Sequence, residues 1–233
     1  MSFNSTLDLS DGRMGLFTAG PASPDTPAIV VLQEIFGVNA SIRQTVEHYA
    51  ACGYRAVAPD LFWRQRPGIE LDPNDEQAHA SAVQAAQAYG KQPGAAMSDL
   101  STLVAHLRER HPRVGMAGYC LGGRMAFLGW LRLDLDAVVS YYGVGLEQLV
   151  GEAAAQRTPL QLHLGTSDHL IPGPAQEIVV AALRDRPSVA IHQYAGAGHA
   201  FARRGGKTRI AEAAELADRR ALAFFDRHLK DIA

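Results

Sequence analysis

The turn at residues 118–123, with the sequence GYCLGG, restricts the fold of this chain more than any other feature. It follows a short apolar run at residues 114–117 and precedes an apolar segment, residues 121–131, that is compatible with a helix. A strand, a sharp turn and a helix with a G-x-C-x-G pattern at the bend are typical of a nucleophile elbow. The glycines fit this interpretation because a Cβ on either side would crowd a strained turn. The pattern therefore predicts that the Cys120 thiol points out of a sheet, at the N-terminus of a helix.

Short apolar runs alternate with helical patterns along the rest of the chain. Strands are predicted at residues 28–32, 54–58, 114–117, 137–142, 160–164 and 189–194, and helices at residues 39–49, 72–89, 95–110, 121–131, 174–183 and 210–229. This alternation with short connections predicts an α/β fold with a doubly wound, mainly parallel sheet flanked by helices. Asp11-Gly12, between residues 6–9 and 14–17, predicts a small N-terminal β-hairpin.

Local signals predict where two of the helices begin. Asn39 is a good N-cap for the first helix, which Gly53 would end. Asp72-Pro73 would place a proline at the first position of the second helix. The 233-residue chain contains no repeat, low-complexity tract or linker, so we predict one domain over residues 1–233.

The charge balance and the cysteine count narrow the possible partners. The 22 Lys and Arg residues against 24 Asp and Glu residues give a net charge of −2, which offers no electrostatic basis for binding nucleic acid or an anionic membrane. Cys52 and Cys120 do not suggest a disulfide framework, and Cys52 is interpreted as a small core hydrophobe. We expect no export signal, because residues 1–6 lack both a basic and an apolar region, and no apolar run approaches the roughly 20 residues that cross a bilayer. We therefore expect a cytoplasmic protein without a nucleic-acid or membrane partner, and we expect a monomer.

A thiol nucleophile needs a base within hydrogen-bonding reach and an acid that orients this base. Asp168 lies a few residues after the strand predicted at 160–164, and His199 follows the strand predicted at 189–194 in the same way. The carboxyl ends of parallel strands meet at one edge of a sheet, which is also where an elbow points. We therefore expect Cys120, Asp168 and His199 to lie close together, in the chain order nucleophile, acid and histidine that α/β-hydrolases use.

Each of these three residues also has an ordinary structural interpretation. An Asp after a strand is often a turn cap, a His in a glycine-rich loop is often merely exposed, and a Cys in a buried turn is often structural. All three residues follow the end of a predicted strand, and this coincidence favours the catalytic interpretation. The other histidines show neither H-x-x-x-H nor H-E-x-x-H spacing, so neither a metal site nor a cofactor is predicted.

Five segments carry a resemblance to a known family. They are residues 33–39 (QEIFGVN), 59–61 (PDL), 118–123 (GYCLGG), 141–145 (YYGVG) and 198–203 (GHAFAR). With these segments the chain resembles the dienelactone hydrolases, a cysteine-dependent branch of the α/β-hydrolase family, over nearly its whole length. The resemblance implies the α/β-hydrolase fold.

The same resemblance implies roles for four side chains. Cys120 would be the nucleophile, His199 the base and Asp168 the acid that orients the base. Glu34 would be an additional carboxylate beside the thiol. It would hold the resting thiol in an inactive arrangement, from which a bound substrate releases it.

The resemblance also implies groups that bind the substrate. The backbone amides of Ile35 and Leu121 would form an oxyanion hole. Arg203 matches one of the two family arginines that clamp the carboxylate of a dienelactone. His79 stands where the second arginine is expected, and an imidazole cannot make the bidentate contact of a guanidinium.

Other residues near these positions are interpreted more simply. Arg204 and Lys207 are expected to be solvated residues of a basic loop. Aromatic side chains are expected to line the apolar wall of the substrate pocket, namely Phe36, Trp63, Tyr119 and Phe201.

The predicted reaction is hydrolysis of a small ester or lactone that carries a carboxylate, such as the opening of dienelactone to maleylacetate in the degradation of aromatic compounds. Three alternatives stay open. One is a broader esterase or thioesterase of the same fold, in which His79 marks a changed pocket. The second is a glutaminase-like or redox-sensing protein with a reactive Cys120 beside Glu34, and the third is a catalytically silent binding protein. A late Asp and His in hydrolase order favour the hydrolase.

Overall fold

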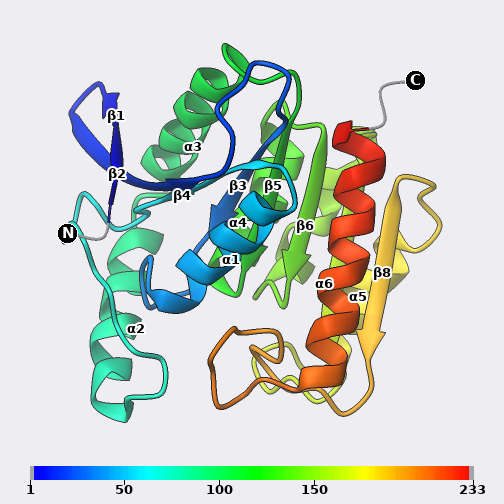
Figure 1. Cartoon of the computed structure of the whole chain (residues 1–233). Coiled ribbons are helices and arrows are strands. Elements are labelled where there is room, and N and C mark those ends of the chain that lie inside the picture. Colours follow the sequence, from blue (N-terminus) through cyan, green and yellow to red (C-terminus); the bar gives the residue numbers. More distant parts are fainter. Residues whose placement is uncertain (1–2, 231–233) are drawn as a thin grey trace. The chain divides into compact units, whose positions relative to one another are not determined.

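The structure of the protein, a computed structural model, describes residues 3–230. The chain divides into two compact units, Met1–Val114 and Gly115–Ala233 (Figure 1). Each unit has its own strands and its own helices. The single domain predicted for residues 1–233 stays a prediction.

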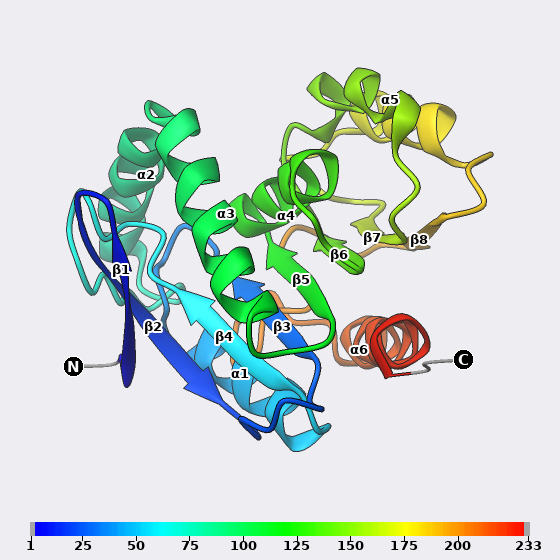
Figure 2. The ribbon, with the colours of Figure 1, turned by 90° about the horizontal axis from the view of Figure 1, so that it is seen from above.

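The first unit contains the predicted hairpin and one parallel strand pair. β1 (Ser5–Leu9) and β2 (Gly12–Ala19) pair antiparallel, and β2 also pairs antiparallel with β4 (Arg55–Pro59). β3 (Ala28–Leu32) pairs parallel with β4 and is buried at every position. The continuous apolar run of β3 fits a strand that is covered on both faces. In Figure 2, α1 (Ala40–Ala51) and α3 (Pro93–Arg108) lie on opposite faces of these strands.

Of the two predicted helix starts in this unit, the first is confirmed and the second is wrong. Asn39 caps α1 as predicted, because its side-chain oxygen accepts a hydrogen bond from the Ile42 amide at 3.2 Å. The helix predicted to begin at residue 72 begins later, since α2 spans Glu76–Gly90 with Asp75 as its N-cap. Asp72 instead closes the preceding turn, where its carboxylate accepts from the Asn74 amide at 2.8 Å. Two acidic caps stand three residues apart, and only the second one starts the helix.

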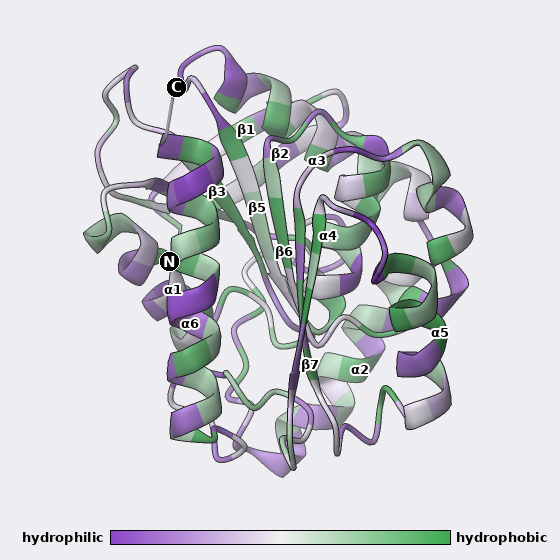
Figure 3. Ribbon diagram, turned by 90° about the vertical axis from the view of Figure 1, so that its right-hand side faces the viewer, coloured by the Kyte–Doolittle hydropathy of each residue, from purple (hydrophilic) through white to green (hydrophobic). Residues whose placement is uncertain are grey.

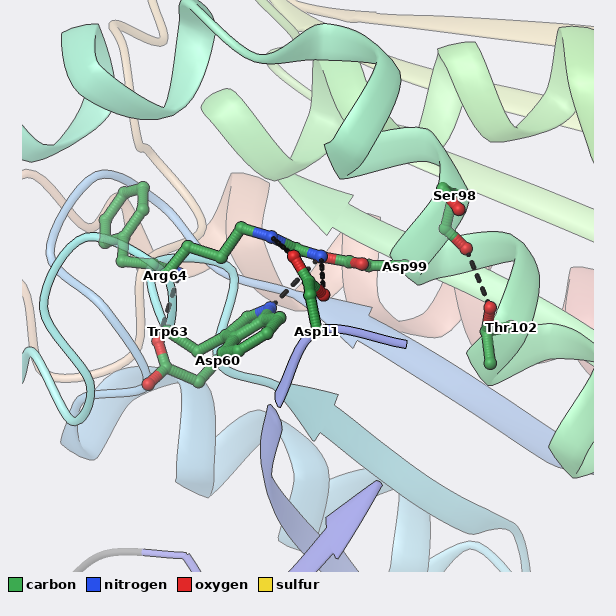
Figure 4. Close-up of polar contacts among 8 residues, drawn as sticks. Asp11, Asp60, Trp63, Arg64, Ser98, Asp99 and Thr102 are labelled. Carbon is green, nitrogen blue, oxygen red and sulfur yellow. Dashed lines mark hydrogen bonds and ion pairs between the residues drawn. The ribbon is translucent and has the colours of Figure 1, made fainter. Parts of the chain in front are cut away.

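Trp63, a predicted pocket residue, belongs to a polar network in the first unit (Figure 4). Its indole N–H donates to the Asp99 carboxylate at 3.0 Å, and its ring faces Gly12, where a Cβ would lie 2.6 Å away. Arg64 stacks on the same ring and forms ion pairs with Asp11 and Asp99. These contacts tie the loop after β4 to the hairpin and to α3. Trp63 is thus a packing residue of this unit, and its role in substrate binding stays a prediction.

The second unit is built on four parallel strands in the order β5-β6-β7-β8. They are β5 (Val114–Tyr119), β6 (Ala137–Tyr141), β7 (Leu160–Gly165) and β8 (Val189–Tyr194). α4 (Leu121–Arg132) and α5 (Gly173–Leu183) lie on one face of these strands, and α6 (Ala211–Phe225) lies on the other (Figure 2). The doubly wound, parallel arrangement predicted for this part of the chain is confirmed.

A row of aromatic rings crosses the strands of the second unit. The strand register aligns Tyr119, Tyr141, His163 and His192 side by side. The ring centroids of Tyr119 and Tyr141 lie 4.6 Å apart, and those of Tyr141 and His163 lie 4.4 Å apart, both pairs stacked. The Tyr141 hydroxyl donates to the Ala217 carbonyl oxygen of α6 at 3.2 Å. Tyr119, predicted to line the pocket, is therefore buried in this row.

The helix over this row is amphipathic. Figure 3 shows hydrophilic and hydrophobic bands alternating along α6. Its buried residues include three alanines, Ala214, Ala217 and Ala221, whose small side chains let the helix approach the rings closely. Within residues 3–230, no helix combines the length and the apolar character that crossing a membrane requires.

Candidate active site

Cys120 occupies a sharp turn between β5 and α4, with φ 55° and ψ −111°. Residues other than glycine rarely adopt this left-handed φ, and such a backbone costs about 1–3 kcal/mol. The turn is also very tight, because a Cβ on Gly118 would lie 1.9 Å from the Gly122 carbonyl oxygen. The strand, turn and helix predicted for this segment are confirmed, and Gly118 is required by the close approach of two backbones.

Gly118→Ala is therefore expected to lower the free energy of unfolding by more than about 3 kcal/mol, because the added methyl group meets backbone rather than a flexible side chain. Gly151→Ala is the matched control in the same unit, since a Cβ at Gly151 meets no atom within 4 Å. Urea unfolding of both variants measures the difference. Equal stability of the two variants would contradict the close approach.

Contacts from β6 hold the first turn of α4. The Ser140 hydroxyl donates to the Gly123 carbonyl oxygen at 2.9 Å, and a Cβ on Gly123 would lie 2.6 Å from the Tyr141 carbonyl oxygen. The Cys120 amide donates to that same Tyr141 oxygen at 3.1 Å. The first amides of a helix have no intrahelical acceptor, and Leu121 supplies the first of them in α4. The turn thus presents a thiol and a backbone donor from adjacent residues.

Asp168 and His199 form a hydrogen-bonded pair after the ends of β7 and β8. Nδ1 of His199 lies 2.8 Å from Oδ2 of Asp168, and the two side chains are 9% and 0% exposed, respectively. Oδ1 of Asp168 accepts from the Leu170 amide at 2.9 Å, so both carboxylate oxygens are engaged. The ionised carboxylate can only accept, so Nδ1 of His199 carries a proton and Nε2 is the nitrogen left for chemistry.

The Cys120 side chain interacts with His199 of this pair. Burial lowers the pKa of His199, but the hydrogen bond with Asp168 and the interaction with Cys120 outweigh burial and raise the pKa to about 10. Among the described residues, no atom lies in hydrogen-bonding geometry to Nε2 of His199, so the thiol lies near the ring without a formed hydrogen bond. The second unit therefore brings Cys120, Asp168 and His199 together, as expected from the strand ends.

The first unit holds several of the other predicted site residues. Glu34 is buried just after β3, and Ile35 is half-buried. The ring centroids of Phe36 and His79 lie 6.1 Å apart, which places two predicted binding residues side by side. The predicted approach of Glu34 to the thiol stays a prediction.

The loop after His199 holds the predicted carboxylate ligand, Arg203. This arginine is only 9% exposed, and a Cβ on Gly206 would lie 2.8 Å from its Cδ, so the stem of the side chain packs against the loop. The expectation that Arg204 is solvated is wrong. Its guanidinium lies 2.8 Å from the Asp218 carboxylate, and both side chains are mostly buried. α6 supplies Asp218, a partner that the loop sequence alone does not reveal.

Tyr142 is a neighbour of the site that the sequence pattern did not indicate. Its ring lies edge-on to the His199 ring, with centroids 5.2 Å apart, and its φ is 38°. The strand predicted at 137–142 ends one residue earlier in the structure, so Tyr142 leaves the strand at a strained turn. Hydrophobic patterning continues through Tyr142 and therefore hides this turn.

Several known proteins are similar to this chain. The model of the dienelactone hydrolase family matches residues 14–229. The chain is 39% identical to a carboxymethylenebutenolidase of Pseudomonas putida over 218 residues, which cover 92% of each chain. It is 42% identical over 231 residues to a candidate carboxymethylenebutenolidase of Azospirillum brasilense, covering 94% of this chain and 95% of the relative. A crystal structure of a candidate dienelactone hydrolase from Klebsiella pneumoniae has a TM-score of 0.77 and 29% identity, with 96% of this chain and 98% of that chain covered. This neighbour also agrees with the fold class predicted from sequence.

Proposed function

The chain belongs to the dienelactone hydrolase family, a family of ester hydrolases, and we propose that it opens a small lactone or enol ester that carries a carboxylate. The meeting of Cys120 with the His199–Asp168 pair supports a cysteine-dependent mechanism. The relatives named carboxymethylenebutenolidase support the substrate class, since that name describes an unsaturated lactone with an exocyclic carboxymethylene group. We place the reaction in the degradation of aromatic compounds and require no cofactor for it.

In the proposed reaction, the proton of the Cys120 thiol resides on Nε2 of His199, as the raised pKa of His199 supports, and the thiolate sulfur attacks the lactone carbonyl carbon. The amides of Leu121 and Ile35 stabilise the oxyanion that forms. When the oxyanion collapses, the ring C–O bond breaks, and the leaving enolate takes the Nε2 proton of His199 and becomes a ketone, which leaves His199 neutral. Water then adds to the thioester while His199 accepts its proton. The C–S bond breaks, which releases the acid and regenerates the thiol.

Asp168 and Glu34 have different tasks in this proposal. Asp168 holds the Nδ1 proton of His199 and stabilises the imidazolium, as the hydrogen bond at 2.8 Å supports. Glu34 holds the resting thiol inactive until a substrate displaces it. A thiolate suits an activated ester with a good leaving group, and an enolate is such a leaving group.

Turnover of a charged and a neutral substrate tests the proposal. Arg203→Gln is expected to raise KM for cis- or trans-dienelactone about tenfold to a hundredfold, because it removes a charge-assisted contact with the carboxylate. KM for an uncharged aryl acetate is expected to stay within twofold. Arg204→Gln is the neighbouring control, since Arg204 is engaged with Asp218. An equal rise in KM for both substrates would contradict a carboxylate clamp.

A broader esterase of the same fold is the second candidate. The observation that favours it is His79, which is exposed beside Phe36 where the family resemblance leads us to expect a second arginine. His79→Arg should then lower KM for the dienelactones and leave the aryl acetate unchanged. A wild type that prefers the neutral ester, with no gain from His79→Arg, favours the broader esterase.

A further inference from the structure

β7 carries a fully buried histidine that the proposed reaction does not use. His163 is 0% exposed and lies in a strand whose sequence, LQLHL, alternates apolar and polar residues. A buried polar side chain is costly unless it is hydrogen-bonded. Both ring nitrogens have partners, because Nδ1 lies 2.7 Å from the Tyr194 hydroxyl and Nε2 lies 2.9 Å from Oε1 of Gln161.

The directions of these hydrogen bonds follow from the chemistry of the groups. Oε1 of Gln161 can only accept, so Nε2 of His163 is the protonated nitrogen and Nδ1 accepts from the Tyr194 hydroxyl. The Gln161 amide nitrogen in turn donates to Nε2 of His192 at 3.2 Å. One continuous chain therefore runs from Tyr194 through His163 and Gln161 to His192, with every donor directed the same way. It requires a neutral His163.

The surroundings of His163 keep this ring neutral. Burial, followed by the nearby His192 and Arg220, lowers the pKa of His163 well below its ordinary value. Arg220 lies over the Tyr194 ring, with its guanidinium carbon 5.6 Å from the ring centroid. Arg220 also interacts with the Tyr194 side chain, and this nearby cation opposes a positive charge on His163.

Two sets of contacts connect His163 with the loop that carries His199. The first runs through the Tyr194 side chain, whose ring centroid lies 4.8 Å from that of Phe201, two residues after His199. The second runs through the backbone, because the His163 carbonyl oxygen accepts from the Tyr142 amide at 2.8 Å. Tyr142 contacts both rings, with centroids 5.2 Å from His199 and 5.7 Å from Phe201.

We infer that His163 is a positioning residue for His199: its side chain holds Tyr194, which packs against Phe201 in the His199 loop, while its backbone carbonyl, common to all variants, holds Tyr142. The loop itself needs such support. Ala200, directly after His199, has a φ of 59°, which is unusual for a residue with a Cβ, and Phe201 is completely buried. Packing around a strained loop determines where its side chains point. The inference rests on the proposed function of His199 as the base that activates Cys120.

The test compares three variants in a Cys52→Ala background, so that Cys120 is the only thiol. His163→Leu removes both hydrogen bonds, and Tyr194→Phe removes only the hydroxyl. His163→Asn places an amide oxygen near the position of Nδ1 and can still accept from Tyr194. We expect kcat for an aryl ester to fall about tenfold in the first two variants with KM within twofold, and we expect His163→Asn to recover most of the loss.

The rate of Cys120 alkylation by iodoacetamide, measured against pH, gives a readout that does not need ester turnover. In His163→Leu and Tyr194→Phe, the midpoint of this profile is expected to rise by about one pH unit, because a displaced imidazolium stabilises the thiolate less. His111→Asn is the control for simple destabilisation. His111 is also buried, but its Nδ1 contacts the Thr26 carbonyl oxygen within the first unit.

The results of these measurements distinguish the positioning role of His163 from the proposed ester hydrolysis. A lower thermal stability with an unchanged alkylation midpoint in both His163→Leu and Tyr194→Phe would overturn the positioning role. A midpoint that rises in these variants and not in His111→Asn supports it. If the wild type hydrolyses none of the esters, the proposed function fails, and the alkylation midpoints still decide the role of His163.

Discussion

Cys120→Ala is expected to lower kcat/KM for a dienelactone or an aryl ester by at least about a thousandfold, because no other group can form the covalent intermediate. The thiol is held in the strained turn between β5 and α4, beside the His199–Asp168 pair. Cys52→Ala is the matched control, since Cys52 is the other cysteine of the chain and lies at the end of α1. Initial rates of purified variants measure the effect. Turnover of Cys120→Ala above a tenth of the wild-type rate would refute a cysteine nucleophile.

Cys120→Gly separates loss of chemistry from loss of fold. At φ 55° a glycine is relaxed where a residue with a Cβ is strained, so Cys120→Gly is expected to be about 1 kcal/mol more stable than Cys120→Ala. Both variants are expected to be equally inactive. If Cys120→Gly is inactive but more stable than Cys120→Ala, the strained turn that the reaction requires lowers the stability of the protein. Urea unfolding gives the comparison.

The second large effect is a loss of stability at alkaline pH that depends on His199. The pKa of His199 is raised from an ordinary 6.5 to about 10, so the folded protein holds this proton more tightly than the unfolded chain. The resulting stabilisation is fully present below pH 6.5 and disappears as the pH rises through 10. The difference between the pKa of 6.5 and the pKa of about 10 corresponds to a contribution of as much as about 5 kcal/mol to the free energy of unfolding.

Unfolding free energies of the wild type and His199→Ala at several pH values measure this contribution. The difference between the two proteins is expected to be constant below pH 6.5 and to shrink by up to about 1.4 kcal/mol per pH unit above it. Asp168→Asn should remove part of the same pH dependence, because it removes the carboxylate that holds the Nδ1 proton. A difference that stays constant from pH 6 to pH 10 would show that His199 is neutral in the folded protein.

Much of the local structure could be predicted from sequence because its causes are local. β3 and β8 have the predicted bounds, since each is an apolar or mixed run between turn residues. The elbow was predictable because the G-x-C-x-G pattern marks the turn, and Gly118 is needed where its backbone approaches that of Gly122. The start of α2 was not, because Asp72 and Asp75 are both suitable caps and only the folded turn decides between them.

The sequence predicted which residues of the site come together, but it did not predict their contacts. Asp168 and His199 were expected near Cys120 only because parallel strands end at a common edge. Their contact at 2.8 Å depends on the pairing of β7 with β8. The ion pair of Arg204 with Asp218 lay beyond this reasoning, because it needs the placement of α6 against the loop.

The sequence by itself thus determined the order of strands and helices, the strained turn at Cys120 and the set of residues at strand ends. These depend on backbone conformation and on apolar periodicity, which neighbouring residues control. Only the tertiary structure decided which buried side chains of different strands share hydrogen bonds, such as His163 with Tyr194. Such pairs depend on the register between strands far apart in the chain, and a shift by one residue would turn each of these side chains to the other face.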